Sequence, residues 1–296
     1  MRPTSLRRQR GFTLVELVVT MVIIGIVAGM VTVFISAPVR SYLDTAARVE
    51  LADAADTATR RIARDVRLAL PNSVRVDPSR KYLELLLTKT GGRYLAQGDA
   101  TPGNILGFDP DAPPANPNVF TIVGAAPSGV QAIRAGDFIV VNNLGDSAPV
   151  NAYECTAKCN RATVASVAGN SVTMVANPFL AANPSNATMR AMPSQSNRFQ
   201  VVTTPVTYYC APGGTLQRYS GYAIQAAQPV NAAAAPLLNA PVSGQLAGQV
   251  AECGFSLGQL ANVQRGLITI NLTLGVKNSS AGQVTLMQQA QVNNTP

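Results

Sequence analysis

The stretch R-G-F-T-L-V-E at residues 10–16, followed by an uncharged and mostly apolar run at residues 17–39, decides the fold of this chain. The run is rich in Val, Ile, Leu, Met and Gly, and it exceeds the ~20 apolar residues that cross a bilayer as a helix. Four arginines lie within the first ten residues, before the run. The positive-inside bias therefore predicts a single-pass membrane protein with a cytoplasmic N-terminus and a long external C-terminal part.

The composition limits what the external part can do. The chain has 296 residues, of which 47% are hydrophobic and 13% charged, so it can bury a sizeable core. It contains no histidine, which is the commonest general base and metal ligand. We therefore predict neither an enzyme nor a metal or cofactor site. Half of the formal charge of +8 comes from the four leading arginines, so no specific nucleic-acid partner is predicted.

Three interpretations of the apolar run differ in where the chain is cut. A secretory signal would be cut after the run, for which Ala37 is the candidate, but Pro38 follows it directly. Proline is a poor partner for extended binding in a peptidase cleft because its φ is fixed and it lacks an N–H. The other two interpretations are an uncut membrane anchor and a signal that is cut before the apolar run.

The segment at residues 10–16 resembles the class III signal of type IV prepilins and of type II secretion pseudopilins. The resemblance implies that prepilin peptidase, a membrane enzyme that is also an N-methyltransferase, cuts after Gly11 and methylates Phe12. It implies that Glu16, fifth in the mature chain, pairs with the N-terminal amine of a neighbouring pilin during assembly. Because Phe12 and Glu16 lie one helical turn apart, pairing within one chain is the alternative.

The residues give this cut a physical purpose. Gly11 leaves the backbone unhindered for a protease, and a cut there removes the four arginines while the mature chain keeps its anchor. Glu16 is the only charged residue from residue 11 to residue 39. A carboxylate at the centre of a bilayer costs about 2.5 to 3.5 kcal/mol and less near its surface, so we expect Glu16 to have a partner.

A long helix is predicted from Phe12 to Leu70, about 88 Å at 1.5 Å per residue, with a kink or local melting at Pro38. Beyond Pro38 the apolar residues recur at spacings of three or four, which predicts one stripe packed on the chain's own sheet. This stripe consists of Leu51, Ala55, Ala58, Ile62, Val66 and Leu70. Asp56 and Arg60 are expected to form an i, i+4 ion pair.

From residue 72 onward, short apolar or alternating runs between Gly, Pro and Asn predict β structure. The expected strands lie at residues 74–76, 82–88, 119–123, 138–142, 163–167, 171–176, 199–209, 215–219, 249–257, 266–275 and 283–292. The last two are expected to form a hairpin, and two proline-containing stretches, 99–118 and 226–242, to be surface loops.

The expected fold class is α+β and type IV pilin-like, with the long N-terminal membrane helix packed on an antiparallel sheet. Four parts are predicted, and they follow one another along the chain. They are the basic leader at residues 1–11, the membrane and assembly half of the helix at 12–38, its amphipathic half at 39–71, and the extracytoplasmic β-rich domain at 72–296.

The four cysteines form an even set, which indicates an oxidising compartment and disulfides. Spacing favours Cys155 with Cys159 and Cys210 with Cys253, although three pairings are possible. A zinc site is the rival, but it normally shows paired C-x2-C ligands. Two weaker candidates stay outside the expected sites: a calcium site at Asp109 and Asp111, and DNA contacts from scattered arginines. Those arginines are Arg190, Arg198 and Arg218.

The stretches at residues 198–210, 216–222 and 284–296 resemble the MshO-type minor prepilins of the mannose-sensitive haemagglutinin (MSHA) pilus. This resemblance implies a non-enzymatic subunit that starts or caps a fibre with other major and minor pilins, at an inner-membrane assembly platform. The alternatives are a J-type minor pseudopilin of type II secretion, a PilW-like minor pilin, an anchored adhesin that does not polymerise, and an exported enzyme.

Overall fold

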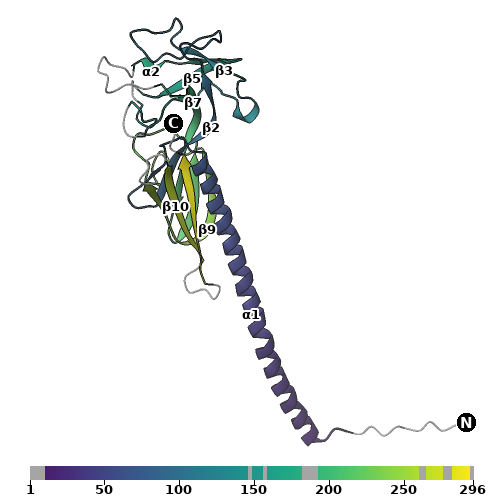
Figure 1. Ribbon diagram of the computed structural model, residues 1–296. Coiled ribbons are helices and arrows are strands. Elements are labelled where there is room, and N and C mark those ends of the chain that lie inside the picture. The colour runs from purple at the N-terminus through teal and green to yellow at the C-terminus, as the bar shows by residue number, and fades with distance from the viewer. Residues whose placement is uncertain are drawn as a thin grey trace, which may run out of the picture. The chain divides into compact units, whose positions relative to one another are not determined.

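The computed structural model describes residues 11–145, 149–155, 159–181, 193–259, 265–275 and 282–293. The leader arginines, Arg190 and most of the turn expected between the last two strands lie outside these ranges. The chain divides into two compact units, residues 1–50 and 51–296. Helix α1 (Leu14–Arg67) runs from the first unit into the second, and Figure 1 traces it together with the strands.

Helix α1 has 54 residues, which corresponds to about 81 Å. Its most apolar stretch, with a mean hydropathy of 2.7, is long enough to cross a membrane, and none of that stretch is buried against the rest of the chain. The helix continues through Pro38 without interruption, so local melting, one of the two predicted effects of this proline, does not occur, and the kink stays a prediction. Hydrogen bonds on the far side of the helix and in the neighbouring turns can hold a helix together at a single proline.

The C-terminal part of α1 packs on the sheet, as predicted. Ala55, Ala58, Ile62 and Val66 are each at most 1% exposed and share one core with the sheet strands. The helix ends at Arg67, before the predicted Leu70. At that point the chain leaves the helix to pair with a strand, because the Leu70 N–H donates to the carbonyl of Leu86 at 2.7 Å.

In the part of the chain that the structure describes, eleven strands form one antiparallel sheet, and each coincides with a predicted strand. They are β1 (Arg75–Val76), β2 (Tyr82–Tyr94), β3 (Val119–Val123), β4 (Phe138–Val140), β5 (Arg161–Ala168), β6 (Ser171–Met174), β7 (Arg198–Cys210), β8 (Gly214–Ser220), β9 (Val242–Gln259), β10 (Arg265–Leu274) and β11 (Val284–Asn293). Strands β2 and β9 are longer than predicted. The expected pairing of the last two strands is confirmed, because β10 and β11 pair from Arg265–Asn293 to Leu274–Val284 without a shift in register.

The order of pairing divides the sheet into two parts. Strands β1, β2, β7, β8, β9, β10 and β11 lie side by side in that order. The remaining strands leave β2 and return to β7 in the order β3, β6, β5, β4. Because β2 also pairs directly with β7, these six strands close into a ring. We call the first part the meander and the second the barrel.

Each part has its own hydrophobic core. The meander core contains the buried face of α1, whereas the barrel core contains Tyr94, Phe120, Phe179 and Phe199. In Figure 1, β9 and β10 lie beside the C-terminal part of α1, while β3, β5 and the short helix α2 (Pro178–Ala181) lie at the other end of β2 and β7.

The two predicted surface loops are irregular, but both contribute buried side chains. In the stretch 99–118, Leu106 is 4% exposed, and the ring of Phe108 lies 5.6 Å from that of Tyr94 and 5.4 Å from that of Phe179. In the stretch 226–242, Leu237 is buried in a cluster of tyrosines. Both stretches therefore contribute side chains to buried clusters. The expectation of surface loops is confirmed for their irregular backbone but not for these buried side chains.

Two disulfides join the cysteines as spacing favoured. Cys155 pairs with Cys159 at a Cα–Cα distance of 5.0 Å, and Cys210 pairs with Cys253 at 6.1 Å. The second disulfide links the end of β7 to β9, which are separated by β8 in the order of the sheet. It therefore closes a loop across three strands of the meander.

Removal of the two disulfides is expected to have unequal effects. Closing a loop of 43 residues limits the unfolded chain more than closing one of 4 residues, which corresponds to about 4 and about 2 kcal/mol in the chain-entropy model. The double variant Cys210→Ser/Cys253→Ser should therefore lose about twice the free energy of unfolding that Cys155→Ser/Cys159→Ser loses. Urea titration of both purified proteins checks this, and equal losses would contradict it.

Candidate functional site

The residues at the predicted cut precede α1 and are open to their surroundings. Gly11, Phe12 and Thr13 lie outside the helix, and the Phe12 side chain is 78% exposed. A Cβ atom built on Gly11 would meet no other atom within 4 Å. Packing among the described residues would therefore accept a side chain at this position.

Thr13 caps the first turn of α1. Its Oγ1 accepts the backbone N–H of Glu16 at 3.3 Å, and its carbonyl accepts the N–H of Leu17 at 3.2 Å. Glu16 thus occupies the third helical position, where the positive end of the helix dipole favours a carboxylate. The pattern T-x-x-E at residues 13–16 is a capping-box signature that our sequence analysis did not use. It fixes Glu16 on the first turn, one turn from the predicted new amine.

Apolar side chains both before and after Glu16 are exposed along the start of the chain and of α1. Phe12, Leu14, Met21, Ile24 and Phe34 are each more than 60% exposed. Exposed apolar area on this scale is unfavourable in water, at roughly 25 cal/mol per Å². This part of α1 therefore needs lipid or other helices as its surroundings.

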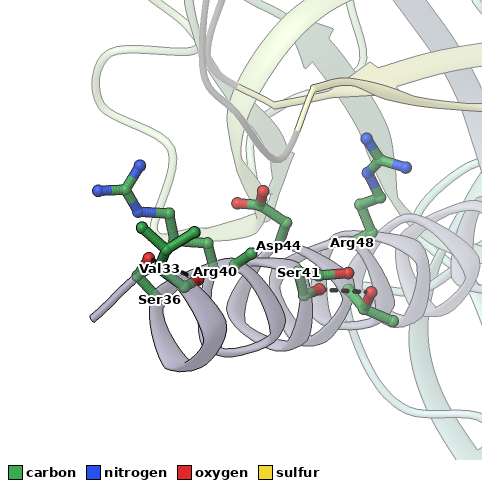
Figure 2. A pocket seen from close by; sticks show the side chains of 8 residues that line it. Val33, Ser36, Arg40, Ser41, Asp44 and Arg48 are labelled. Carbon is green, nitrogen blue, oxygen red and sulfur yellow. Dashed lines mark hydrogen bonds between the residues drawn. The ribbon is translucent and has the colours of Figure 1, made fainter. Parts of the chain in front are cut away.

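A polar face begins on α1 where the apolar run ends. Figure 2 shows Ser36, Arg40, Asp44 and Arg48 along a shallow hollow whose lining comes entirely from α1. Their spacing of four residues places them on one side of the helix. The Thr45 hydroxyl donates to the carbonyl of Ser41 at 2.7 Å.

A buried polar network attaches α1 to the sheet. The carboxylate of Asp65 accepts the hydroxyl of Tyr208 on β7 at 2.5 Å and the guanidinium Nε–H of Arg218 on β8 at 3.1 Å. Burial and the adjacent carboxylate of Asp65 raise the pKa of the Tyr208 hydroxyl, which therefore stays protonated and keeps donating. Arg218 is consequently a structural cation of this network.

A second network holds the start of the sheet. Glu84 is fully buried, and its carboxylate accepts Arg75 at 2.6 Å and the Tyr222 hydroxyl at 2.8 Å. Burial raises the pKa of the Glu84 carboxyl, and the two partners oppose that rise. Arg75 also donates to the carbonyls of Gln225 and Ala226. Both networks were missed in the sequence because their members lie far apart along the chain.

Loss of the Asp65 carboxylate is expected to weaken the attachment of α1. Asp65→Ala leaves Arg218 and the Tyr208 hydroxyl, both largely buried, without their acceptor, and should reduce the free energy of unfolding by about 2 to 3 kcal/mol. Asp56→Ala is the matched control on the same helix, because the confirmed Asp56–Arg60 pair is exposed. It should cost far less than Asp65→Ala, because solvent screens an exposed pair. Equal losses in chemical denaturation would contradict this role of Asp65.

The other candidate residues have structural explanations. The Asp109 carboxylate accepts the backbone N–H of Asp111 at 3.0 Å, an arrangement typical of a turn. Within the described ranges, no three His, Cys, Asp or Glu side chains gather as metal ligands would. Arg198 begins β7 and is exposed.

A family model for the prokaryotic N-terminal methylation motif matches residues 6–32, which include the predicted cut, Glu16 and most of the apolar run. The match supports a type IV pilin-like prepilin, a class of structural subunit that prepilin peptidase processes and that assembles with other pilins. Together with the apolar start of α1, it fits a membrane-anchored pilin. No curated protein and no solved structure matches the chain. The match covers the N-terminal part only and does not specify the pilus system.

Proposed function

We propose that this chain is a minor pilin-like subunit of a type IV pilus of the MSHA type, which acts in initiating, assembling or capping the fibre. In this proposal prepilin peptidase cuts after Gly11 and methylates Phe12, and Glu16 then pairs with the amine of a neighbouring pilin. The observation that carries it is the start of α1: an open Gly11–Phe12 bond, a Glu16 whose backbone N–H is capped by Thr13, and a helix apolar and long enough to cross a membrane.

The subunit would first lie in the inner membrane, with its N-terminus cytoplasmic and its β-rich part periplasmic. The two disulfides support this orientation because the periplasm is oxidising. Extraction from the membrane into a fibre would exchange lipid around α1 for the helices of other pilins. The assembly platform and the other pilins are therefore the proposed partners, and no catalytic step is assigned to this chain.

Sheared surface fibres test the proposal. Cells that make the full chain should release it with MSHA-type pili, and cells without prepilin peptidase should keep it in the inner membrane. Recovery with type II secretion components alone would indicate a J-type pseudopilin. Release that does not depend on the peptidase, or permanent retention in the membrane, would contradict a pilin role.

A further inference from the structure

The C-terminal part of α1 carries two rows of charged residues. In each row the charged residues are spaced by three, and each arginine of the second row follows an acid of the first by eleven residues. The acids are Glu50, Asp53 and Asp56, and the arginines are Arg61, Arg64 and Arg67. Eleven residues make three helical turns and about 20° more, so an acid and its arginine lie on one side of the helix, about 16.5 Å apart along its axis.

The two rows lie on the side of α1 that faces away from the sheet. The opposite side, which includes Ile62, is buried in the meander core. Asp56 pairs with Arg60, but this pair is itself exposed and therefore weak. Within the described ranges, the other row members that follow Glu50 are exposed and form no ion pair. They are Asp53, Arg61, Arg64 and Arg67.

Such rows are unfavourable for a helix that stands alone. Residues three apart are neighbours on the helix surface, so like charges repel along each row. The helix dipole favours Arg64 and Arg67, which lie in the last turn, but it does not favour an acidic row around Asp53. A second helix that brought the opposite charge to each row would relieve this repulsion.

A second copy of this chain carries the required charges. Two copies anchored in one membrane by the same N-terminal segment have parallel helices, and this step rests on the proposed function. Without a shift along the axis, parallel copies place like charges side by side. A shift of eleven residues instead places Asp53 of one copy beside Arg64 of the other, and Asp56 beside Arg67. The two rows are therefore complementary in the shifted arrangement.

We propose that the exposed face of α1 from Asp53 to Arg67 is an interface between two copies of this chain, which lie parallel and are shifted by about 16.5 Å along the helix. The acidic row of one copy contacts the arginine row of the other, so the contact is head-to-tail. It leaves one row of each copy free, and a further copy can bind there with the same shift. The charge rows would thus set the axial register between neighbouring copies.

Thiol crosslinking in the membranes of cells that make the full chain tests this register. Thr57 and Leu68 are uncharged and exposed, and they also lie eleven residues apart. The Leu68 N–H still donates to the carbonyl of Arg64 at 3.2 Å, so Leu68 continues the last turn of the helix. The described native cysteines are all paired, which leaves an introduced thiol as the reactive one.

Two differently tagged copies, one with Thr57→Cys and one with Leu68→Cys, should form a mixed disulfide dimer on mild oxidation. Its yield should be at least about fivefold higher than that of either variant with itself, because a disulfide needs its two Cα atoms within about 7 Å. A dimer of Thr57→Cys with itself at equal yield would indicate unshifted helices and would overturn the proposal. The absence of any dimer would overturn it as well.

A charge exchange tests whether the two rows hold the copies together. Asp53→Arg or Arg64→Asp, introduced into both tagged copies, brings like charges together and should lower the yield of the mixed dimer by about fivefold. The double variant Asp53→Arg/Arg64→Asp restores opposite charges between copies and should return the yield to within about twofold of the original. The two residues are about 16.5 Å apart within one chain, so this recovery requires a contact between copies. A double variant as poor as the single ones would contradict the pairing.

Fibre recovery separates this inference from the proposed function. If the chain enters sheared fibres but forms no mixed dimer in membranes or fibres, the shifted pair is wrong and the pilin role stands. If the mixed dimer forms in membranes and the chain never enters fibres, the pilin role is wrong and the shifted pair stands.

Discussion

Glu16→Gln is expected to reduce incorporation into fibres by at least tenfold while leaving the cut and the methylation in place. A buried ion pair whose one member is removed commonly costs about 3 to 5 kcal/mol, which corresponds to a factor of 10² or more in association. The glutamine preserves the shape of the side chain and the backbone bond to Thr13. The change therefore removes the charge and little else.

Quantitative blotting of sheared fibres against membranes measures this effect, and the mass of the membrane form reports processing. Thr13→Val is the matched control, because it removes the capping hydroxyl but keeps the carboxylate of Glu16. It should cost about 1 kcal/mol of helix-end stability and reduce incorporation far less. Normal incorporation of Glu16→Gln would favour an anchored protein that does not polymerise.

Gly11→Val is expected to block the cut almost completely, so that the uncut chain accumulates in the membrane. The structure offers no steric reason for glycine here, because the space around a Cβ on Gly11 is empty. A branched side chain hinders extended backbone from entering a peptidase cleft, and this is the only expected consequence of the change.

Gly25→Ala is the matched control, since the space around its Cβ is also empty and it lies within α1. It should be cut normally. The two variants are compared by the size of the chain on a gel, with cells lacking the peptidase as the uncut reference. Normal processing of Gly11→Val would contradict the assignment of the cut to the Gly11–Phe12 bond.

The sequence predicted the existence of every strand because apolar alternation and turn residues mark each one locally. It did not predict the ring of six strands, because periodicity shows that a strand has two faces and not which strands it pairs with. The second half of β2 illustrates a further reason. Gly91 and Gly92 resemble a turn, but a Cβ on either would lie 2.9 Å from Phe199 of β7, so glycine permits close pairing.

The residues of the candidate site could be predicted from the sequence, whereas the members of the buried Asp65 network could not. Gly11, Phe12 and Glu16 stand in one short motif, and every feature of that motif is local. Asp65 instead lies 143 residues from Tyr208 and 153 residues from Arg218, so nothing in the neighbourhood of Asp65 indicates its partners. Single acidic residues on an amphipathic helix are usually solvated, and only the folded chain distinguishes this one.

Mass spectrometry of the protein extracted from membranes or fibres tests the central claim most directly. The account predicts that the mature chain begins with N-methylated Phe12, and that Glu16 is its fifth residue. A chain that still carries Met1, or one that begins at Pro38 after cleavage behind the apolar run, would contradict it.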